Sequence, residues 1–249
     1  MNRYCNQQLH PRQQANAMSN NEATLNLEPI GYIESDFKEK FATPRQPGLV
    51  TEAQAKLVLQ GPYNQADAFD GLEAFSHIWL IFGFHATAEQ GWKPKVRPPR
   101  LGGNAKLGVF ATRSTFRPNP LGLSLVRLEK ITTQQGVCLH IQGADLIQGT
   151  PVYDIKPYLP WVESQPDAAS GFAGEAQTLD LPVNFSAPAE AYLQTKPQLR
   201  ELIAQVLKHD PRPAYQQQDE RVYGCLLQQE NVQWQVLPEQ ILVTAISPA

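Results

Sequence analysis

Three polar insertions interrupt apolar, strand-like stretches of the 249-residue chain, and each carries side chains able to bind a charged ligand. The insertions are TPRQPG at 43–48, TRSTFRPNPLG at 112–122 and GTPVYDIKPYLPW at 149–161. Arg45 and Arg113 can each pair with a carboxylate through two parallel hydrogen bonds, and Asp154 can accept hydrogen bonds from hydroxyl or ammonium groups. Each insertion taken singly is more often a plain turn than a site.

Positive charge is concentrated in one segment. The chain has a net charge of −3, yet eight of its 21 Lys and Arg residues lie between positions 90 and 128, where none of its 24 Asp and Glu residues occurs. The eight are Lys93, Lys95, Arg97, Arg100, Lys106, Arg113, Arg117 and Arg127. A positive segment on a negative body indicates a phosphate-rich ligand, with a solvated basic loop as the alternative.

Several common sites are not indicated. The stretch LGGN is no dinucleotide fingerprint, and the chain contains no phosphate-binding GxxxxGK[ST] loop, no GxSxG elbow and no credible Ser-His-Asp set. Cys5, Cys138 and Cys225 lie far apart without a CxxC pair, which favours reduced thiols. His77 and His85 are eight residues apart, which is not a usual ligand spacing, so we expect no metal site.

No stretch has the roughly 20 apolar residues that a membrane span needs. The longest apolar run, IWLIFGF at 78–84, has the length of a core strand. The start of the chain lacks the apolar centre of a secretory signal, so we expect a soluble, cytoplasmic protein. Residues 1–27 are rich in Asn and Gln and are expected to form a flexible extension.

The apolar pattern up to position 147 predicts β-strands separated by Gly- and Pro-rich turns. The run around 75–84 is apolar on both faces, which favours a central strand covered on both sides. Strands at such short spacing predict a mainly β fold with an antiparallel barrel or sandwich. The expected strands lie near 30–33, 55–59, 75–84, 106–112, 121–131 and 136–147.

The composition changes after position 161. We expect a barrel-type domain at 28–165, a small polar linker at 166–180 and a small α+β C-terminal domain at 181–249. A helix is predicted before the DPRP sequence, because Leu199, Leu202, Ile203, Val206 and Leu207 recur at helical spacing. The segments RVYGCLL, VQWQVL and QILVTAI are expected to be its strands.

Five sequence blocks together resemble the TsaA-like family of tRNA (adenine-N6)-methyltransferases, which act on threonylcarbamoyladenosine beside the anticodon. The blocks are IGYIESDFKEKFATPRQPG, DGLEAFSHIWLIFGFH, GVFATRSTFRPNPLGLS, GTPVYDIKPYLPW, and DPRPAYQ with RVYG. The resemblance covers about residues 28–225. Thr115 departs from it, because proline is expected there; this changes loop stiffness but leaves the flanking arginines in place.

The resemblance implies a single-sheet antiparallel β-barrel that binds S-adenosyl-L-methionine without a Rossmann domain, in agreement with the missing glycine fingerprint. It also implies a homodimer with the cofactor site near the subunit boundary. A threonine tRNA is the expected substrate. The cofactor-binding residues carried over from the family pattern are Pro44, Arg45, Gln46, His77, Ile78, Arg113, Leu123, Asp154, Ile155, Lys156 and Pro157.

Methyl transfer to an amine needs orientation of the nucleophile and exclusion of water, and we expect a strong general base to matter less. Asn119, held between two prolines, is the candidate acceptor for the amine N–H, although Asn before Pro is also ordinary turn chemistry. Asp154 is equally compatible with a turn residue, and His77 with a core histidine.

The tRNA anticodon stem-loop is the expected partner of the basic segment, whose phosphate-binding candidates are Lys93, Lys95, Arg97, Arg100, Lys106 and Arg117. In the C-terminal domain, Arg212, Tyr215 and Arg221 either extend this surface or belong to a domain that only supports the barrel. Two alternatives remain: a non-catalytic RNA-binding β-barrel module, and an enzyme for a small phosphorylated metabolite, which leaves the long basic segment unexplained.

Overall fold

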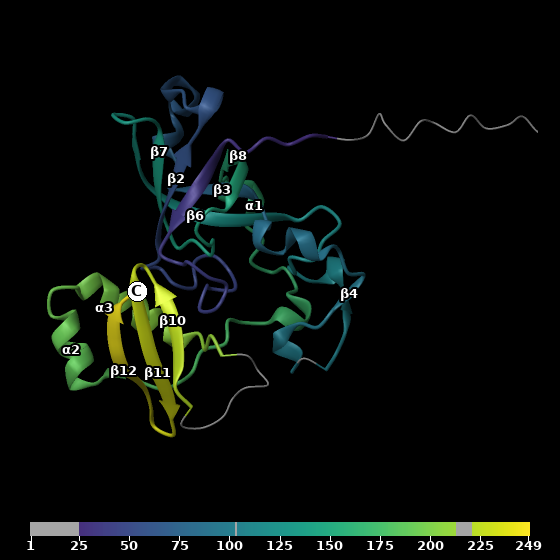
Figure 1. Ribbon diagram of the computed structural model, residues 1–249. Helices are drawn as coiled ribbons and strands as arrows, with labels where there is room; N and C mark the ends of the chain where they lie inside the picture. Colours follow the sequence, from purple (N-terminus) through teal and green to yellow (C-terminus); the bar gives the residue numbers. More distant parts are fainter. Residues whose placement is uncertain (1–24, 103, 213–220) are drawn as a thin grey trace, which may run out of the picture.

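The computed structural model describes residues 25–102, 104–212 and 221–249 (Figure 1). The extension expected at 1–27 therefore lies almost entirely outside the described residues. Within these ranges no helix combines the length and the apolar character needed to cross a lipid bilayer.

A closed six-stranded antiparallel barrel forms the N-terminal part of the fold, with the strand order β1-β2-β7-β6-β3-β8. Alternate residues such as Ile33, Leu57, Leu80 and Leu139 are fully buried inside it. The expected mainly β architecture with a single-sheet barrel is thus confirmed. The strands are β1 (Gly31–Ser35), β2 (Gln54–Leu59), β3 (His77–Gly83), β6 (Leu121–Thr132), β7 (Cys138–Gln142) and β8 (Pro151–Pro157).

Three local expectations were wrong. The insertion at 149–161 is mostly a strand, since β8 closes the barrel by pairing with both β1 and β3. The expected strand at 106–112 is reduced to β5 (Leu107–Gly108), which pairs with β4 (Lys95–Val96) outside the barrel. β3 is covered fully on one face only: Ile78, Leu80 and Phe82 are buried, while His77, Trp79 and Ile81 remain partly exposed.

The segment between β3 and β6, residues 84–120, leaves the barrel and carries seven of the eight cations of the basic segment; we call it the basic excursion. It lies beside the barrel and carries β4 in Figure 1. Its helical parts are the 3₁₀ turns η4 (His85–Gln90), η5 (Pro99–Leu101) and η6 (Val109–Ala111). The other short helical segments are η1 (Gly61–Tyr63), η2 (Ala66–Phe69), η3 (Leu72–Ala74), α1 (Pro160–Glu163) and η7 (Gly171–Ala173).

The C-terminal part packs two helices against a four-stranded sheet of order β10-β11-β12-β9. The helix expected from the 3.6-residue apolar period is α3, and all five of its apolar residues are buried. α2 and β9 were not expected; β9 adds to β12 as a parallel edge strand. The elements are β9 (Val183–Phe185), α2 (Ala187–Leu193), α3 (Pro197–Lys208), β10 (Tyr223–Leu227), β11 (Glu230–Leu237) and β12 (Gln240–Pro248).

The long connection between β1 and β2, residues 36–53, joins the two parts, and we call it the β1–β2 loop. Its apolar residues Phe37, Val50 and Ala53 belong to the hydrophobic core of the C-terminal part, where they pack with Trp234. Phe37 also forms a β-bridge with Leu227. In Figure 1 this loop lies between the barrel and the C-terminal sheet. The insertion TPRQPG is thus held from both sides.

Candidate functional site

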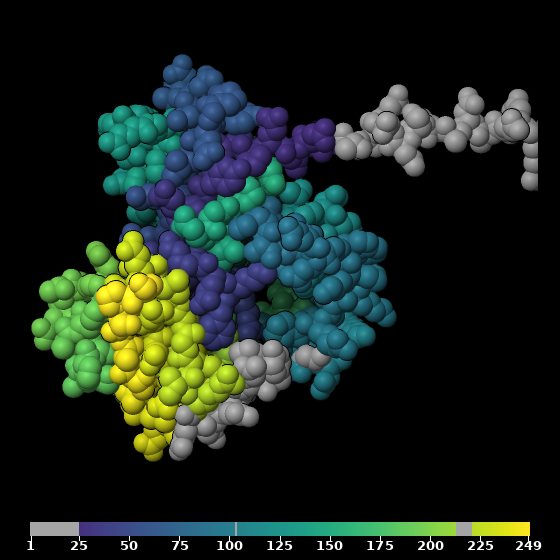
Figure 2. All heavy atoms as spheres, in the orientation of Figure 1, coloured from purple at the N-terminus to yellow at the C-terminus, as the bar shows by residue number. Residues whose placement is uncertain are grey.

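A large open cleft of about 2240 Å³ lies where the β1–β2 loop, the ends of β3 and β6, the basic excursion and the 170–179 segment meet. Figure 2 shows it as a hollow between the purple β1–β2 loop and the blue-green basic excursion. The segment expected to be a mere linker, 166–180, therefore contributes a wall of the cleft through residues from Ser170 to Leu179.

The described residues that line the cleft are strongly unbalanced in charge. Ten are cationic: Lys40, Arg45, Lys93, Lys95, Arg97, Arg100, Lys106, Arg113, Arg117 and Arg212. Two are acidic, Asp145 and Asp210. Asp210 is engaged by Arg212, whose Nε and Nη2 donate to its Oδ1 and Oδ2 at 2.7 and 3.0 Å. The cleft thus offers an anion-binding surface with a single carboxylate, Asp145, that has no ion-pair partner among the described residues.

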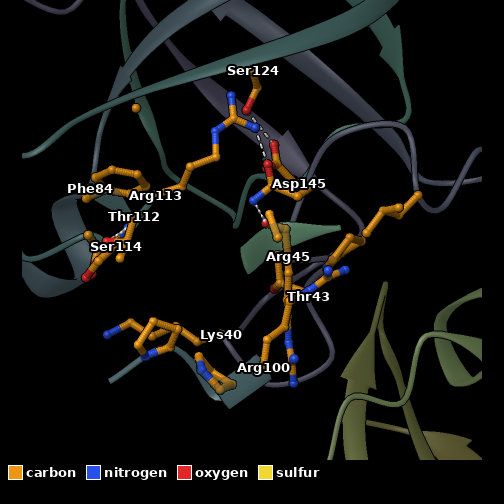
Figure 3. A pocket seen from close by; sticks show the side chains of 18 of the residues that line it. Lys40, Thr43, Arg45, Phe84, Arg100, Thr112, Arg113, Ser114, Ser124 and Asp145 are labelled. Atoms are coloured by element: carbon orange, nitrogen blue, oxygen red, sulfur yellow. Dashed lines mark hydrogen bonds between the residues drawn. The ribbon is translucent and has the colours of Figure 1, made fainter. Parts of the chain in front are cut away.

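Two of the three polar insertions meet at the cleft. Arg113 donates a hydrogen bond to the side-chain oxygen of Gln46, and Gln46 donates to the backbone carbonyl of Arg45 (Figure 3). The loop is anchored below this point by the N–H of Gly48, which donates to the carbonyl of Gly143 at 2.8 Å. Both glycines have positive φ, of 76° and 74°, a conformation that glycine adopts readily.

Asp145 lies beside this pair of loops and was missed by the sequence reasoning. Its neighbours Ala144 and Leu146 point into the barrel core, so the Asp145 side chain turns to the opposite side, toward the cleft. The hydroxyl of the buried Ser124 donates to its Oδ1 at 2.6 Å (Figure 3). Burial raises the pKa of Asp145, while the Ser124 hydroxyl and the charge of Arg113 oppose that rise. The available signal was a carboxylate two residues after a glycine in an otherwise apolar stretch.

Further candidate residues lie on the outer face of the barrel, beyond the edge of the cleft. Leu123, Ile81 and Asp154 form one cross-strand row over β6, β3 and β8, because directly paired residues share a face. Leu123 and Ile81 line the cleft. Asp154 binds Lys156 in an exposed ion pair of 3.0 Å. It also accepts a hydrogen bond from its neighbour's N–H at 2.9 Å.

The remaining cofactor candidates lie farther along the same strands. His77 is four residues before Ile81 on β3, or about 13 Å along the strand, and its ring contacts Tyr158 edge-on. Ile78 is fully buried and Ile155 packs against the same barrel core. Of the family-derived set, the cleft collects Pro44, Arg45, Gln46, Arg113 and Leu123, whereas His77, Ile78, Asp154, Ile155, Lys156 and Pro157 do not line it.

The basic candidates all line the cleft, but they differ in how much of each side chain is free. Lys93 lies over the ring of Phe116, with Nζ 3.8 Å from its centroid. Arg117 donates to the carbonyls of Thr112 and Val109 at 2.8 and 3.3 Å, so part of its guanidinium holds the excursion together. Such contacts orient these cations toward the cleft without neutralising them.

Asn119 is exposed and does not line the cleft. Its carbonyl accepts a hydrogen bond from the N–H of Leu121 at 2.7 Å, as in a tight turn before β6. Gly122 follows, and a Cβ there would come within 2.2 Å of the Phe82 ring. The RPNPLG sequence therefore returns the chain to the barrel where β3 and β6 touch most closely.

Several groups outside the cleft bear on the other expectations. Within the described ranges, no three His, Cys, Asp or Glu side chains gather as metal ligands would. Cys138 and Cys225 are free thiols, and burial raises the pKa of Cys225 to about 12. Arg221 lies over the ring of Tyr223, and the Tyr215 candidate falls outside the described residues.

The chain is similar in sequence to tRNA methyltransferases and in structure to one of them. A tRNA (adenine(37)-N6)-methyltransferase of Escherichia coli is 52% identical over 233 residues, which cover 91% of this chain and 99% of the relative. A putative S-adenosylmethionine-dependent methyltransferase of Pseudomonas aeruginosa is 47% identical over 217 residues, which cover 85% of this chain and 92% of the relative. The crystal structure of TrmO from Pseudomonas aeruginosa superposes with a TM-score of 0.74 at 38% identity, covering 90% of this chain and 98% of that one.

Family models account for nearly all of the described chain. The model of the tRNA-methyltransferase O N-terminal domain matches residues 32–164, and the model of the TrmO C-terminal domain matches residues 178–249. The resemblance to the TsaA-like methyltransferases is thereby confirmed. This chain, with its closed barrel and its cationic cleft, belongs to the TrmO family of tRNA methyltransferases.

Proposed function

We propose that the protein transfers a methyl group from S-adenosyl-L-methionine to the N6 atom of threonylcarbamoyladenosine at position 37, beside the anticodon of tRNA, with a threonine tRNA as the substrate. The relatives named above act on adenine 37 of tRNA or are named for the cofactor. The observation that carries the proposal is the cleft itself, where the two arginine-bearing loops meet among ten cationic side chains.

The donor set of the cleft fits the cofactor. S-adenosyl-L-methionine supplies a methyl group activated on a positively charged sulfur. Arg45 and Arg113 suit its carboxylate, because a guanidinium pairs with a carboxylate in a fixed two-point geometry. The apolar row of Ile81 and Leu123 suits the adenine ring, and Asp154 at the end of that row suits ribose hydroxyls. His77, Lys156 and Pro157 extend this proposed surface, whereas Ile78 and Ile155, whose side chains pack in the barrel core, would contribute through their backbone.

The basic excursion is the proposed platform for the anticodon stem-loop. Anticodon bases can be splayed out of the loop, which brings a modified base into a cleft while the phosphates stay on the rim. Lys93, Lys95, Arg97, Arg100, Lys106 and Arg117 supply the positive charge for those phosphates. Phe110, 73% exposed on the same excursion, offers a face for base stacking.

The proposal includes a homodimer that acts in the cytoplasm. The face that bears His77 and the end of β8 continues into α1, where Trp161 is 82% and Val162 50% exposed. Exposed apolar side chains next to proposed cofactor residues suit a subunit boundary at the cofactor site. The domain division at 28–165, 166–180 and 181–249 is proposed with one amendment: the β1–β2 loop packs with the C-terminal core.

Methyl transfer tests this function directly. The purified protein is incubated with methyl-labelled cofactor and total tRNA from a strain lacking the protein, and the tRNA is then digested to nucleosides. Label in methylated threonylcarbamoyladenosine is the expected result. Arg113→Ala should abolish transfer and cofactor binding together, whereas Lys130→Ala, on the exposed side of β6 and outside the cleft, serves as the control. Tight tRNA binding without cofactor binding or transfer would replace the proposal with a non-catalytic RNA-binding module.

A further inference from the structure

The nitrogen to be methylated is a weak nucleophile, and this raises a chemical requirement that the site must meet. In threonylcarbamoyladenosine the N6 atom is bonded to both the purine ring and a urea carbonyl, so its lone pair is delocalised in two directions. Loss of the N–H proton restores nucleophilic character. A positioned base that accepts this proton typically accelerates such a step by about 10²–10⁴-fold. The inference below rests on the proposed function.

The candidate bases in the cleft are few. Asn119, expected to orient the amine, is exposed, does not line the cleft and has no basic atom. Asp210 accepts hydrogen bonds from two guanidinium nitrogens of Arg212, one on each carboxylate oxygen. His209 donates through Nε2 to the carbonyl of Leu49 at 2.8 Å, and its other ring nitrogen, Nδ1, is buried, so neither nitrogen is open to a substrate in the cleft. This leaves Asp145 and His85 among the described cleft residues that could accept a proton.

Asp145 is better placed than His85. It is hydrogen-bonded to Ser124, the residue that directly follows the proposed cofactor residue Leu123. It also interacts electrostatically with Arg113, another proposed cofactor residue. His85 instead begins the η4 turn, and the charge that acts on it is that of Lys40. Asp145 therefore lies among the residues that would surround the cofactor, as Figure 3 shows for Arg113 and Ser124.

We propose that Asp145 is the general base of this enzyme, accepting the N6 proton of the nucleoside, and that Ser124 and Arg113 position its carboxylate. The bond between N6 and the methyl carbon forms as the carbon–sulfur bond breaks, and the pair of electrons of that bond stays on sulfur. The N6 proton passes to a carboxylate oxygen of Asp145 and is then released to water. No oxidant, reductant or metal enters the balance.

The surroundings of Asp145 match this role. Burial raises its pKa, which makes the ionised carboxylate a stronger base than an exposed aspartate. The hydroxyl of Ser124 and the charge of Arg113 lower that pKa and keep the ionised form accessible. Arg45 and Lys40, from the β1–β2 loop, and Arg100, from the basic excursion, are further charged groups that line the cleft (Figure 3). The reaction rate should therefore fall as the pH falls through the pKa of Asp145, where the carboxylate becomes protonated.

Single-turnover methyl transfer by the full chain at saturating cofactor and tRNA, followed against pH, tests the assignment. Asp145→Asn should lower the rate at least 10²-fold and flatten the acidic limb of the profile, while the calorimetric Kd for S-adenosyl-L-methionine changes less than about twofold. Asp145→Glu should recover part of the rate. Ser124→Ala should move the acidic limb to higher pH, because one interaction that lowers the pKa is lost. His85→Gln should keep the limb where it is.

The outcomes separate this inference from the proposed function. A wild-type protein without transfer would refute the proposed function before any variant is compared. Active wild type with an Asp145→Asn variant that keeps both rate and pH profile would overturn the base assignment alone. Loss of cofactor binding in parallel with rate, in a variant with an unchanged melting temperature, would make Asp145 a cofactor ligand instead. An infrared difference titration of wild type against Asp145→Asn reports the carboxyl protonation independently of activity.

Discussion

Gln205 on α3 and Thr51 on the β1–β2 loop are 154 residues apart in sequence, yet their side chains are hydrogen-bonded at 3.2 Å. The same amide oxygen of Gln205 accepts the backbone N–H of Glu52 at 3.1 Å. Five residues before Thr51 lies Gln46, the partner of Arg113. The C-terminal part thus holds the loop that carries the proposed cofactor residues.

Loosening this attachment should weaken cofactor binding from a distance. Gln205→Ala removes both hydrogen bonds to the loop, of about 1 kcal/mol each, so the Kd for S-adenosyl-L-methionine should rise severalfold. Calorimetric titration measures it, and Gln194→Ala on the exposed end of α2 is the matched control. An unchanged Kd in a folded Gln205→Ala variant would show that the loop keeps its conformation without this support.

The contact between Gly122 and Phe82 should be a strict packing requirement. A Cβ at Gly122 would lie 2.2 Å from the Phe82 ring, whereas a Cβ at Gly108, with φ of −59°, meets nothing within 4 Å. Gly122→Ala should therefore destabilise the fold by about 1–3 kcal/mol, as overpacking does, while Gly108→Ala should have a small effect. Urea unfolding measures both. Phe82→Leu should relieve part of the clash in the Gly122→Ala background.

Charge in the basic excursion should govern tRNA affinity through phosphate contacts. Removal of one phosphate-binding cation should lower the slope of log K against log salt by about 1. Arg100→Ala is expected to do this and to leave cofactor affinity unchanged. Lys130→Ala removes an equal charge from the exposed side of β6, outside the cleft, and should leave the slope alone. Equal slopes for the two variants would contradict the proposed platform.

Glu230 should make the C-terminal part sensitive to acid. Burial raises its pKa, but hydrogen bonds from Lys196 at 2.6 Å and from Tyr192 at 2.6 Å outweigh this, and the net pKa is lowered. A lowered carboxyl pKa stabilises the fold above the unfolded-state pKa, and the stabilisation is lost as pH falls through the folded-state value. Glu230→Gln should therefore lower the melting temperature more at pH 7 than at pH 3. Glu239→Gln, on an exposed turn, is the control.

Local patterns in the sequence predicted those elements whose own residues show the periodicity of the structure they form. α3 was recognised because its five apolar residues face one core. β8 was not, because Pro151 and Pro157 at its two ends and the Asp154–Lys156 pair resemble a polar turn. Pro151 is tolerated as the first residue of the strand, where no ladder donor is needed. A barrel closes through pairing of strands that are far apart in the sequence, so a short stretch of sequence does not reveal which strand closes it.

The site was predictable to a similar degree. The family pattern identified Arg45, Gln46 and Arg113, and the structure brings these residues into contact. Asp145 went unnoticed because it was read as part of a half-buried strand, whereas β7 ends at Gln142 and the chain turns at Gly143. Which side of a segment faces a cleft depends on the elements packed opposite to it. Here those elements lie up to about a hundred residues away in the sequence.

The β1–β2 loop also makes the chain hard to divide. Phe37 and Val50 are 1% exposed only because α3 and the C-terminal sheet cover them. A chain cut at the linker would present these side chains to water on one fragment and an open core around Trp234 on the other. The two parts are therefore expected to melt as one cooperative unit. A nascent chain can complete its folding only after its last strands have been synthesised.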